Sequence, residues 1–328
     1  MPEAQRRWKI ATALAIAGSL SLAACALRDD RNGPDPLAGE QYAITQHGME
    51  AAWQTTEGDD VVIAVVDTGI DLRHPDLKDR IVAGYDFVDD DRRPNDENGH
   101  GTHVAGSAAA TGDNAKGVIG MAPQAKIMPL KVLDGEGVGS SEAVAAAIRY
   151  AVDNGADVIN LSLGGSSDLL GRLFSNLDPA NLEIRRAEER GVVVVAAAGN
   201  DAAFITAFNP NTPLLVVNAS NEVETSARFS NFGDPRAVSA AGARIISTAP
   251  TYATGIWPDG SAGYEFLDGT SMAAPHVAGI AALLTTTGAS PAQVREALIE
   301  TAVNPNDVGF LGAGIVRADR ALEYLEQN

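Results

Sequence analysis

Apolar residues in this chain gather in short continuous runs, separated by longer stretches in which apolar and polar residues mix. The runs are rich in β-branched residues and have the length of strands. Runs without alternation are typical of strands that are covered on both faces, so we predict a largely parallel sheet. The predicted strands are residues 61–66, 125–132, 158–163, 192–197 and 214–217.

The stretches between these runs predict helices, and several carry start or stop residues. Ser140 and Ser141 are candidate N-caps for one helix and Ser290 for another, while Gly155 and Gly191 follow two predicted helix ends. Strands that alternate with helices indicate an α/β fold, a three-layer sandwich with a largely parallel central sheet. The predicted helices are residues 103–110, 142–152, 182–190, 277–284 and 291–301.

The first 24 residues are organised like an export signal. A basic patch precedes a mostly apolar run (residues 10–22), which has the length of a signal-peptide core and is short for a membrane span. The segment from Leu22 to Cys25 then resembles the lipobox of bacterial lipoproteins. That resemblance implies lipidation of Cys25 and export to the periplasmic or cell-surface face of a bacterial membrane. The alternative is an ordinary cleavable signal with Cys25 nearby by chance.

Composition narrows the classes of function. The 328 residues are 45% hydrophobic and 20% charged, which is typical of a globular protein with one large domain and extensions. The net charge of −19 disfavours nucleic-acid binding through a broad basic face. Cys25 is the single cysteine, so an intramolecular disulfide is excluded. We expect a signal at residues 1–24, a polar tether at 25–40 and one domain at 41–328.

Three residues with complementary chemistry lie where such a sheet gathers functional groups. Asp67 directly follows a predicted strand, His100 leads into a helix, and Ser271 lies at an expected helix start with Pro275 in the first turn. A serine hydroxyl needs an adjacent base, an imidazole can take and return the proton, and a carboxylate orients the imidazole. Taken singly, each residue is more often a turn, a structural histidine or a helix cap.

The three motifs together, Asp-Thr-Gly, His-Gly-Thr-His and Gly-Thr-Ser-Met-Ala, resemble the subtilases, and most of all their thermitase-like branch. The resemblance implies a subtilisin-like fold and a serine endopeptidase that works through an acyl-enzyme intermediate, with Asp67, His100 and Ser271 as its triad. The family's oxyanion asparagine falls on Asn200, whose amide could donate to the tetrahedral oxyanion. The alternative for Asn200 is a simple turn residue after a glycine.

Two glycine-containing segments resemble the edges of the family's substrate groove. Residues 137–139 lack bulk, so that an extended peptide can approach, and residues 162–164 follow a predicted strand. Small residues predict a roomy, apolar pocket that accepts large uncharged side chains with weak selectivity, although glycine loops also occur without function. The expected substrate-binding residues are Gly137, Val138, Gly139, Ser162, Leu163, Gly164, Ala197 and Gly199.

Two sets of oxygen-bearing residues match calcium sites of the thermitase-like branch, whose calcium would be structural; no catalytic cofactor is expected. Calcium takes about six to eight oxygen ligands. Asp113 is an alternative to its neighbour Asn114 in the first set, and a solvated acidic loop is the alternative for the second. The first set is Asp35 and Asp76, the side chain of Asn114, and the carbonyls of Thr111, Lys116 and Val118; the second is Asp86, Asp89, Asp91 and Asn95.

Two departures from the family pattern stand out. Secreted subtilases usually carry a pro-domain, and the interval between Cys25 and Gln41 leaves no room for one. Folding would then rely on calcium and local propensity, or on a separate chain. The second departure is at residues 240–242, Ala-Ala-Gly where the family often has Ala-Pro-Gly, which we interpret as a loop variation.

Two functions fit these observations. The first is an active endopeptidase that acts on extended peptides or unfolded proteins, contacts the membrane only through its lipid, and is monomeric. The second is a catalytically silent lipoprotein that binds extended peptides in the same groove. A pure binder has no need of a triad or an oxyanion donor, so the sequence favours the first.

Overall fold

Seven strands form the central sheet of the computed structural model, which describes residues 33–163, 179–204 and 211–328. The predicted signal, the lipidation residue Cys25 and the groove residue Gly164 lie outside the described residues. The strands are β1 (Val62–Asp67), β2 (Tyr85–Asp86), β3 (Lys126–Lys131), β4 (Val158–Leu161), β5 (Val193–Ala197), β6 (Leu215–Ser220) and β7 (Val238–Ala241).

All neighbouring strands of this sheet are parallel, in the order β2-β3-β1-β4-β5-β6-β7. The connections after β1 lead to β2 and β3 on one side of it, and those after β4 lead to β5, β6 and β7 on the other. The crevice between the ends of β1 and β4 is therefore a topological switch point, where α/β sheets bind ligands. The prediction of a largely parallel sheet is confirmed, and the five predicted strands match to within three residues. A separate antiparallel hairpin pairs β8 (Ile245–Thr248) with β9 (Tyr264–Leu267).

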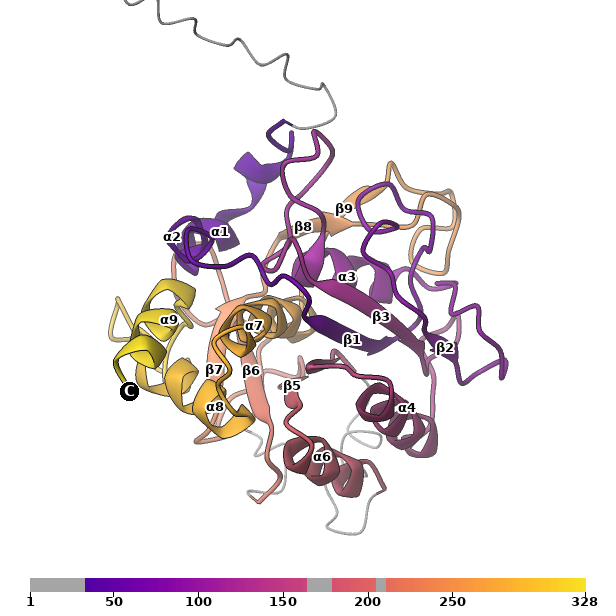
Figure 1. The fold of residues 1–328 in the computed structure, drawn as a ribbon. Coiled ribbons are helices and arrows are strands. Elements are labelled where there is room, and N and C mark those ends of the chain that lie inside the picture. The colour runs from indigo at the N-terminus through magenta and orange to yellow at the C-terminus, as the bar shows by residue number, and fades with distance from the viewer. Residues whose placement is uncertain (1–32, 164–178, 205–210) are drawn as a thin grey trace, which may run out of the picture.

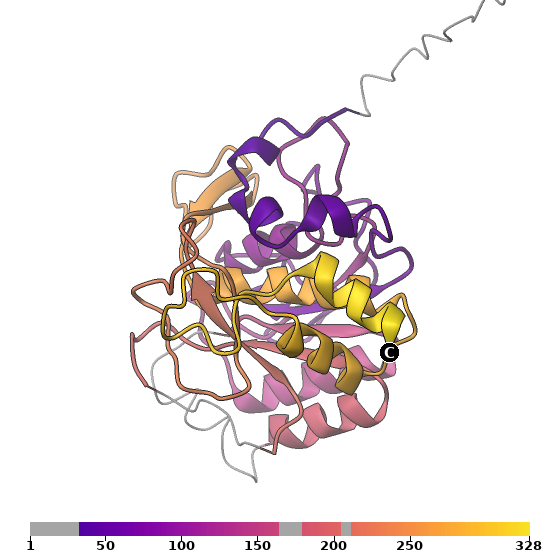
Figure 2. The same ribbon diagram turned by 90° about the vertical axis from the view of Figure 1, so that its left-hand side faces the viewer.

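Helices cover both faces of the sheet, giving the predicted three layers (Figures 1 and 2). Side chains of β1 alternate between the two core layers: Ile63 and Val65 pack on one face, Ala64 and Val66 on the other. The face of Ala64 is covered by α4 (Ser141–Asp153) and α6 (Pro179–Glu189). The opposite face carries α1 (Tyr42–Gln46), α2 (Met49–Ala52), α3 (His100–Ala109), α7 (Thr270–Thr285), α8 (Pro291–Glu300) and α9 (Ala318–Gln327), and the short 3-10 helix η1 (Ala38–Glu40) lies near the start of the described chain.

Two helix starts follow from capping residues. The hydroxyl of Ser140 accepts a hydrogen bond from the N–H of Ala143, and Ser290 forms a capping box with Gln293. By contrast, α3 and α7 begin three and seven residues before the helical stretches predicted at 103–110 and 277–284, although α7 does begin beside Ser271, where the serine motif placed a helix start; neither start has a side-chain cap. Their first turns therefore carry no capping signal in the sequence.

Residues 240 and 241 were expected in a loop, and that interpretation was wrong. Ala240 and Ala241 belong to β7, which pairs with β6 and is fully buried. A strand at this position has no need of the φ restriction that proline supplies. The Ala-Ala-Gly sequence therefore completes the sheet.

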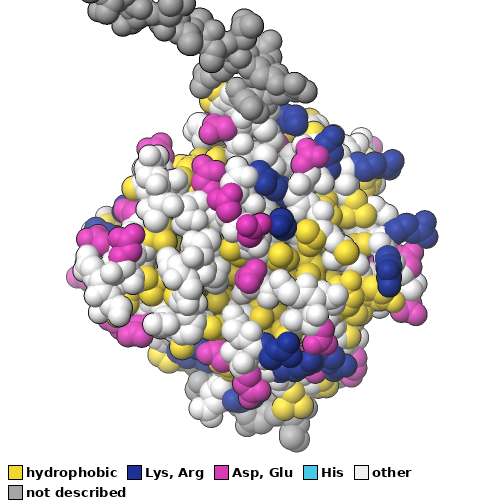
Figure 3. Space-filling view, viewed as in Figure 1, with side chains coloured by type: hydrophobic (Ala, Val, Ile, Leu, Met, Phe, Trp, Pro, Cys, Tyr) yellow, Lys and Arg dark blue, Asp and Glu magenta, His cyan; other side chains and the backbone are white. Residues whose placement is uncertain are grey.

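The surface and the helices add two observations. On the face seen in Figure 3, acidic and basic side chains are intermixed, with uncharged surface between them. Among the described residues, the helices are all too short or too polar to cross a lipid bilayer.

Candidate active site

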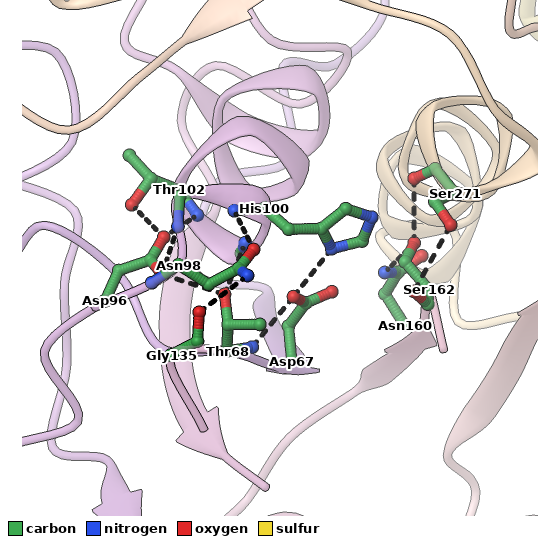
Figure 4. Close-up of polar contacts among 12 residues, drawn as sticks. Asp67, Thr68, Asp96, Asn98, His100, Thr102, Gly135, Asn160, Ser162 and Ser271 are labelled. Atoms are coloured by element: carbon green, nitrogen blue, oxygen red, sulfur yellow. Dashed lines mark hydrogen bonds and ion pairs between the residues drawn. The ribbon is translucent and has the colours of Figure 1, made fainter. Parts of the chain in front are cut away.

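Asp67 and His100 form a hydrogen-bonded pair at the carboxyl end of β1 (Figure 4). Asp67 is the last residue of β1 and is fully buried, while His100 is the first residue of α3. The Nδ1 atom of His100 lies 2.7 Å from Oδ1 of Asp67, which also accepts the N–H of Thr68 at 2.8 Å. Because an ionised carboxylate only accepts, Nδ1 carries the proton and Nε2 is the basic nitrogen of the neutral ring.

The surroundings of this pair favour the charged form of His100. Removal from water lowers the pKa of His100, but the charge and hydrogen bond of Asp67, with the charge of Asp96, outweigh it and raise the pKa overall. The other oxygen of Asp67, Oδ2, is buried and has no donor among the described residues. The His100 side chain is 22% exposed, so solvent reaches the ring. The pair is thus arranged to accept a proton at Nε2 and stabilise the resulting imidazolium.

A second buried carboxylate, Asp96, holds the backbone around His100. No sequence pattern singled it out. Burial raises the pKa of Asp96, and its hydrogen bonds oppose that rise. Its Oδ1 accepts from Thr68 Oγ1, Asn98 N and Gly99 N at 2.8, 3.1 and 2.7 Å, and its Oδ2 accepts from Thr102 N and Oγ1 at 2.9 and 2.6 Å.

These bonds connect the segments that carry Asp67 and His100. Thr68 directly follows Asp67, and its hydroxyl both donates to Asp96 and accepts the N–H of Gly101 at 2.9 Å. Gly101 directly follows His100. The hydroxyl of Thr68 therefore joins the end of β1 to the start of α3 beside the Asp67–His100 pair. This limits how far the imidazole can move from its carboxylate.

Ser271, the second residue of α7, makes two contacts with Ser162 on the strand side of the site (Figure 4). Its hydroxyl donates to the carbonyl of Ser162 at 3.3 Å, and the hydroxyl of Ser162 donates to the carbonyl of Ser271 at 2.9 Å. The Nδ2 atom of Asn160 in turn donates to the Ser162 hydroxyl at 2.8 Å. Within the described residues, the Ser271 hydroxyl makes no hydrogen bond to His100.

Pro275 explains why the carbonyl of Ser271 is available. In a helix, the N–H of residue 275 would donate to the carbonyl of residue 271, and proline lacks that N–H. The prediction that Pro275 lies in the first turn was wrong, because α7 begins at Thr270 and Pro275 is its sixth residue. The Ser162 hydroxyl supplies the missing donor, and it thereby fixes the backbone of Ser271 to the segment after β4.

Asn200 follows β5, and α7 fixes the orientation of its amide. Its Oδ1 accepts the N–H and the hydroxyl of Thr270 at 2.8 and 3.0 Å. The hydroxyl of Thr270 also accepts the N–H of Gly199 at 3.0 Å. Because Oδ1 is engaged, Nδ2 remains as a donor, and it has no acceptor within the part of the chain that the structure describes. The N–H of Ser271, in the first turn of α7, is a second such donor.

A cavity of about 490 Å³ brings these groups together. His100, Ser271 and Asn200 line it, and so do three of the residues expected in the substrate groove: Gly137, Ser162 and Gly199. The other described groove residues lie behind or beside it. Leu163 and Ala197 are buried in the core, Val138 is exposed, and Gly139 pairs with Leu133 in an isolated bridge.

Sequence patterns missed much of the cavity wall. Four of the missed residues adjoin predicted ones, so the motifs could have located them: Thr68 beside Asp67, Glu136 beside Gly137, Asp201 beside Asn200 and Met272 beside Ser271. Three of the missed residues carry carboxylates, so the cavity is more acidic than the apolar pocket that was predicted from the small groove residues. The missed lining residues are Thr68, Asn98, Leu133, Glu136, Asp201, Ile256, Leu267, Asp268 and Met272.

Comparison with known proteins identifies the family of the chain. Residues 58–315 match the model of the subtilase family. The chain belongs to the subtilase family. This subtilase is 42% identical to thermitase of Thermoactinomyces vulgaris, over 88% of this chain and 99% of thermitase. It is 41% identical to a thermophilic serine proteinase of Bacillus sp. (strain AK1), over 87% of this chain and 68% of that protein. The expected thermitase-like branch is therefore supported.

Solved structures agree with the fold. A protease of Pseudoalteromonas arctica PAMC 21717 superposes on this subtilase with a TM-score of 0.78 and 31% identity, covering 89% of this chain and 99% of the other. Fervidolysin of Fervidobacterium pennivorans, a keratinolytic enzyme related to subtilisin, superposes with a TM-score of 0.74 and 33% identity, covering 90% and 47%. The chain is a subtilisin-like serine peptidase, as predicted.

The first set of expected calcium residues converges in this subtilase. Asp35 and Asp76 are buried, and Asn114 reaches both: its N–H donates to Asp35 Oδ1 at 3.1 Å and its Nδ2 to Asp76 Oδ1 at 2.7 Å. Burial raises the pKa of Asp35, hydrogen bonds from the N–H groups of Asp113 and Asn114 oppose it, and the charge of Asp76 adds to it. Val118 N also donates to Asp76, at 3.2 Å.

The rest of that set follows the same loop. The N–H of Thr111 donates to the carbonyl of Asp76 at 3.0 Å, and the N–H of Lys116 to Oδ1 of Asn114 at 2.8 Å. The side chain of Asp113 is exposed, so Asn114 is the one that contacts Asp76. Residues 111–118 therefore lie against Asp76 and contact it through N–H donors.

The second set gathers around Asp86, whose Oδ1 accepts the N–H of Asp89 at 3.0 Å and whose backbone pairs with that of Asp91, but protein cations lie beside two of its members. Asp86 lies 3.7 Å from the Nζ atom of the buried Lys131, which also pairs with Glu97 at 2.9 Å. Asp91 pairs with Arg93 at 3.1 Å. Protein cations thus already neutralise two of the expected ligands. The remaining members, Asp89 and Asn95, are exposed, as the alternative of a solvated acidic loop expects.

Proposed function

We propose that this subtilase is a serine endopeptidase in which Asp67, His100 and Ser271 form the catalytic triad and Asn200 donates to the oxyanion. The observation that carries the proposal is the hydrogen bond of 2.7 Å from the buried Asp67 to His100, which lines one cavity with Ser271 and Asn200. A carboxylate bonded to an imidazole, and a hydroxyl in the cavity that this imidazole lines, are the three groups that nucleophilic acyl transfer requires.

The reaction begins with rotation of the Ser271 hydroxyl away from the Ser162 carbonyl and toward Nε2 of His100. As Oγ bonds to the substrate carbonyl carbon, its proton passes to Nε2, and the carbonyl oxygen becomes an anion. The Nδ2 of Asn200 and the N–H of Ser271 then donate to that oxygen. Asp67 stabilises the imidazolium, which returns the proton to the leaving amine, and water hydrolyses the acyl-enzyme by the reverse sequence.

Extended peptides or unfolded protein segments are the substrates that fit this groove. Such a segment adds as a strand beside residues 137–139 and the segment after β4. The alternative is a silent protein that binds peptides without cleaving them. Thr270 donates twice to Oδ1 of Asn200, which leaves Nδ2 as a donor for the oxyanion. Such a donor serves catalysis and not strand addition, so the orientation of Asn200 favours the endopeptidase over the silent binder.

A fluorophosphonate probe separates the two functions. Protein that begins after residue 25 is expected to hydrolyse casein and to be labelled at Ser271 in the presence of calcium. Ser271→Ala should fold and bind peptide but neither cleave nor label, whereas Ser162→Ala keeps the nucleophile and should still label. A folded wild type that shows no labelling would favour the silent binder.

We also propose one structural calcium ion, held by the first ligand set. Two buried carboxylates, Asp35 and Asp76, lie close enough to repel, and neither pairs with a lysine or arginine among the described residues. Such an oxygen set suits a hard dication. Excess EGTA should lower the thermal midpoint of the wild type. It should have much less effect on Asp76→Asn, and an unchanged wild-type midpoint would contradict the site.

The N-terminal lipid is a further proposal. Cys25 lies in a lipobox-like segment, and the polar residues 26–32 are the proposed tether. Residues 33–40, also expected in the tether, instead contact the domain: the N–H groups of Gly33 and Leu37 donate to the carbonyls of Asp113 and Gly117, and Asp35 is buried. We expect the protein to be exported, anchored to a bacterial membrane and monomeric. Cys25→Ser should move it from the membrane pellet to the soluble fraction, whereas Ser21→Ala, beside the motif, should leave it in the pellet. Persistent pelleting of Cys25→Ser would contradict the anchor.

A further inference from the structure

A long loop without helix or strand crosses the segment that leads to His100. It joins Thr248 at the end of β8 to Tyr264 at the start of β9, and we call residues 249–263 the crossing loop (Figure 1, orange, beside β9). Loops of more than about 12–15 residues without secondary structure are uncommon in compact domains and are usually functional. No sequence motif predicted a role for it.

Hydrogen bonds anchor the crossing loop to three consecutive carbonyls ahead of His100. All three acceptors are backbone carbonyls of one short segment, so the loop is held against the chain that leads directly into His100. At the base of the loop, Oδ2 of Asp71 accepts the N–H and the hydroxyl of Thr251 at 3.0 and 2.7 Å. The three bonds run from Tyr252 Oη to Asp96 O, from Gly255 N to Glu97 O, and from Ile256 N to Asn98 O, each at 2.9 Å.

Close packing defines the position of the loop as well. A Cβ atom on Gly99 would lie 2.6 Å from the ring of Trp257, so the indole covers the residue next to His100. A Cβ atom on Gly255 would lie 2.6 Å from the carbonyl of Gly135, on the way to the glycine edge of the groove. The crossing loop therefore closes the gap between the histidine segment and that edge.

Ile256 is the residue of this loop that reaches the cavity. It is 38% exposed and lines the cavity together with His100 and Leu133. We assign the pocket that the small groove residues predict, and that Ser162 and Gly199 line, to the primary residue, the one before the scissile bond. Successive side chains of an extended peptide point to opposite sides. The penultimate residue, which precedes the primary one, would then point away from that pocket and toward His100, Leu133 and Ile256.

We infer that Ile256 determines specificity at the penultimate substrate residue. With Leu133 it forms an apolar wall that favours an aliphatic side chain there over glycine. The inference rests on the proposed endopeptidase function. The side chain of Ile256 is not used to anchor the loop, because its contact with Asn98 is made by the backbone N–H. Shortening the side chain therefore removes the wall and leaves the anchors in place.

Peptide p-nitroanilides that differ only at the penultimate residue test this. With phenylalanine as the primary residue, wild type should show a kcat/KM about tenfold higher for leucine than for glycine at the penultimate position. Ile256→Ala should reduce that ratio to about twofold, and Ile256→Val should give an intermediate value. A second series that varies the primary residue should give the same relative rates in all three proteins.

Val223→Ala is the matched control, because Val223 is an exposed apolar residue in the turn after β6 and does not line the cavity. It should keep the wild-type ratio. An active Ile256→Ala enzyme with the wild-type ratio would overturn the inference and leave the proposed function intact. Failure of wild type to cleave any of the peptides would instead count against the proposed function. Thermal midpoints of all variants show whether a lost ratio comes with lost folding.

Discussion

Asp96→Asn is the substitution that best tests how the site is held together. The change keeps the size of the side chain and replaces one carboxylate oxygen by an NH₂ group. The structure indicates which oxygen: Oδ1 accepts three donors and Oδ2 accepts only the N–H and hydroxyl of Thr102, so the amide should place its NH₂ at the Oδ2 position. The hydroxyl can turn to accept, but the N–H of Thr102 cannot.

The expected cost follows from these bonds. A hydrogen bond to a charged group is worth about 1.5–3 kcal/mol, and a buried donor left without an acceptor costs about 1–3 kcal/mol. Removing the charge also relieves the desolvation that raises the pKa of Asp96, which offsets part of the loss. We therefore expect unfolding to become easier by about 2–4 kcal/mol. Displacement of the histidine segment should lower kcat/KM by about 10- to 100-fold.

Two measurements separate this positioning role from general destabilisation. Because the charge of Asp96 helps raise the pKa of His100, the acid limb of the kcat/KM profile should move to lower pH in Asp96→Asn. Denaturant unfolding gives the stability change, and Asp59→Asn, at an exposed aspartate, is the matched control. An active Asp96→Asn enzyme with wild-type stability and an unmoved acid limb would refute the reasoning.

Three further predictions concern catalysis and acid stability. Asn200→Ala should lower kcat by about 10²- to 10³-fold with little change in KM, as steady-state kinetics would show, because one oxyanion donor is lost. The pKa of His100 is raised above 6.5, so kcat/KM of the wild type should fall with decreasing pH through a value above 6.5; a limb below 6.5 would contradict this. Burial lowers the pKa of His47 to about 4 and of His103 and His276 to about 3. The unfolded chain therefore binds protons first, and stability should fall from pH 6.5 toward pH 4 by up to about 1.4 kcal/mol per pH unit for each histidine. His47→Gln should flatten that slope in thermal midpoints.

Short-range features of the sequence predicted the strands of the central sheet and two of the helix starts. The β-branched runs became strands of the central sheet because a strand covered on both faces has to be apolar throughout. The caps at Ser140 and Ser290 were read correctly because each cap acts within three residues. The serine motif placed a helix start at Ser271, one residue after the observed start of α7, but the contact that holds this first turn was not predicted, since it is made by Asn200, which is 70 residues away.

The same division runs through the active site. Asp67, His100 and Ser271 were located from short motifs, because each motif is a local chain conformation with a chemical group at its tip. Asp96 was not, although it lies four residues before His100, because its importance comes from donors that the fold brings to it.

The position of the crossing loop could not be predicted from the sequence at all. The bonds that join residues 252–256 to residues 96–98 are made to backbone carbonyls, which every residue type possesses. No side-chain pattern records such a contact. A substitution at Ile256 would therefore leave every motif of the sequence unchanged. The motifs are enough to identify the chemistry, whereas the specificity proposed for Ile256 follows only from the position of the loop in the structure.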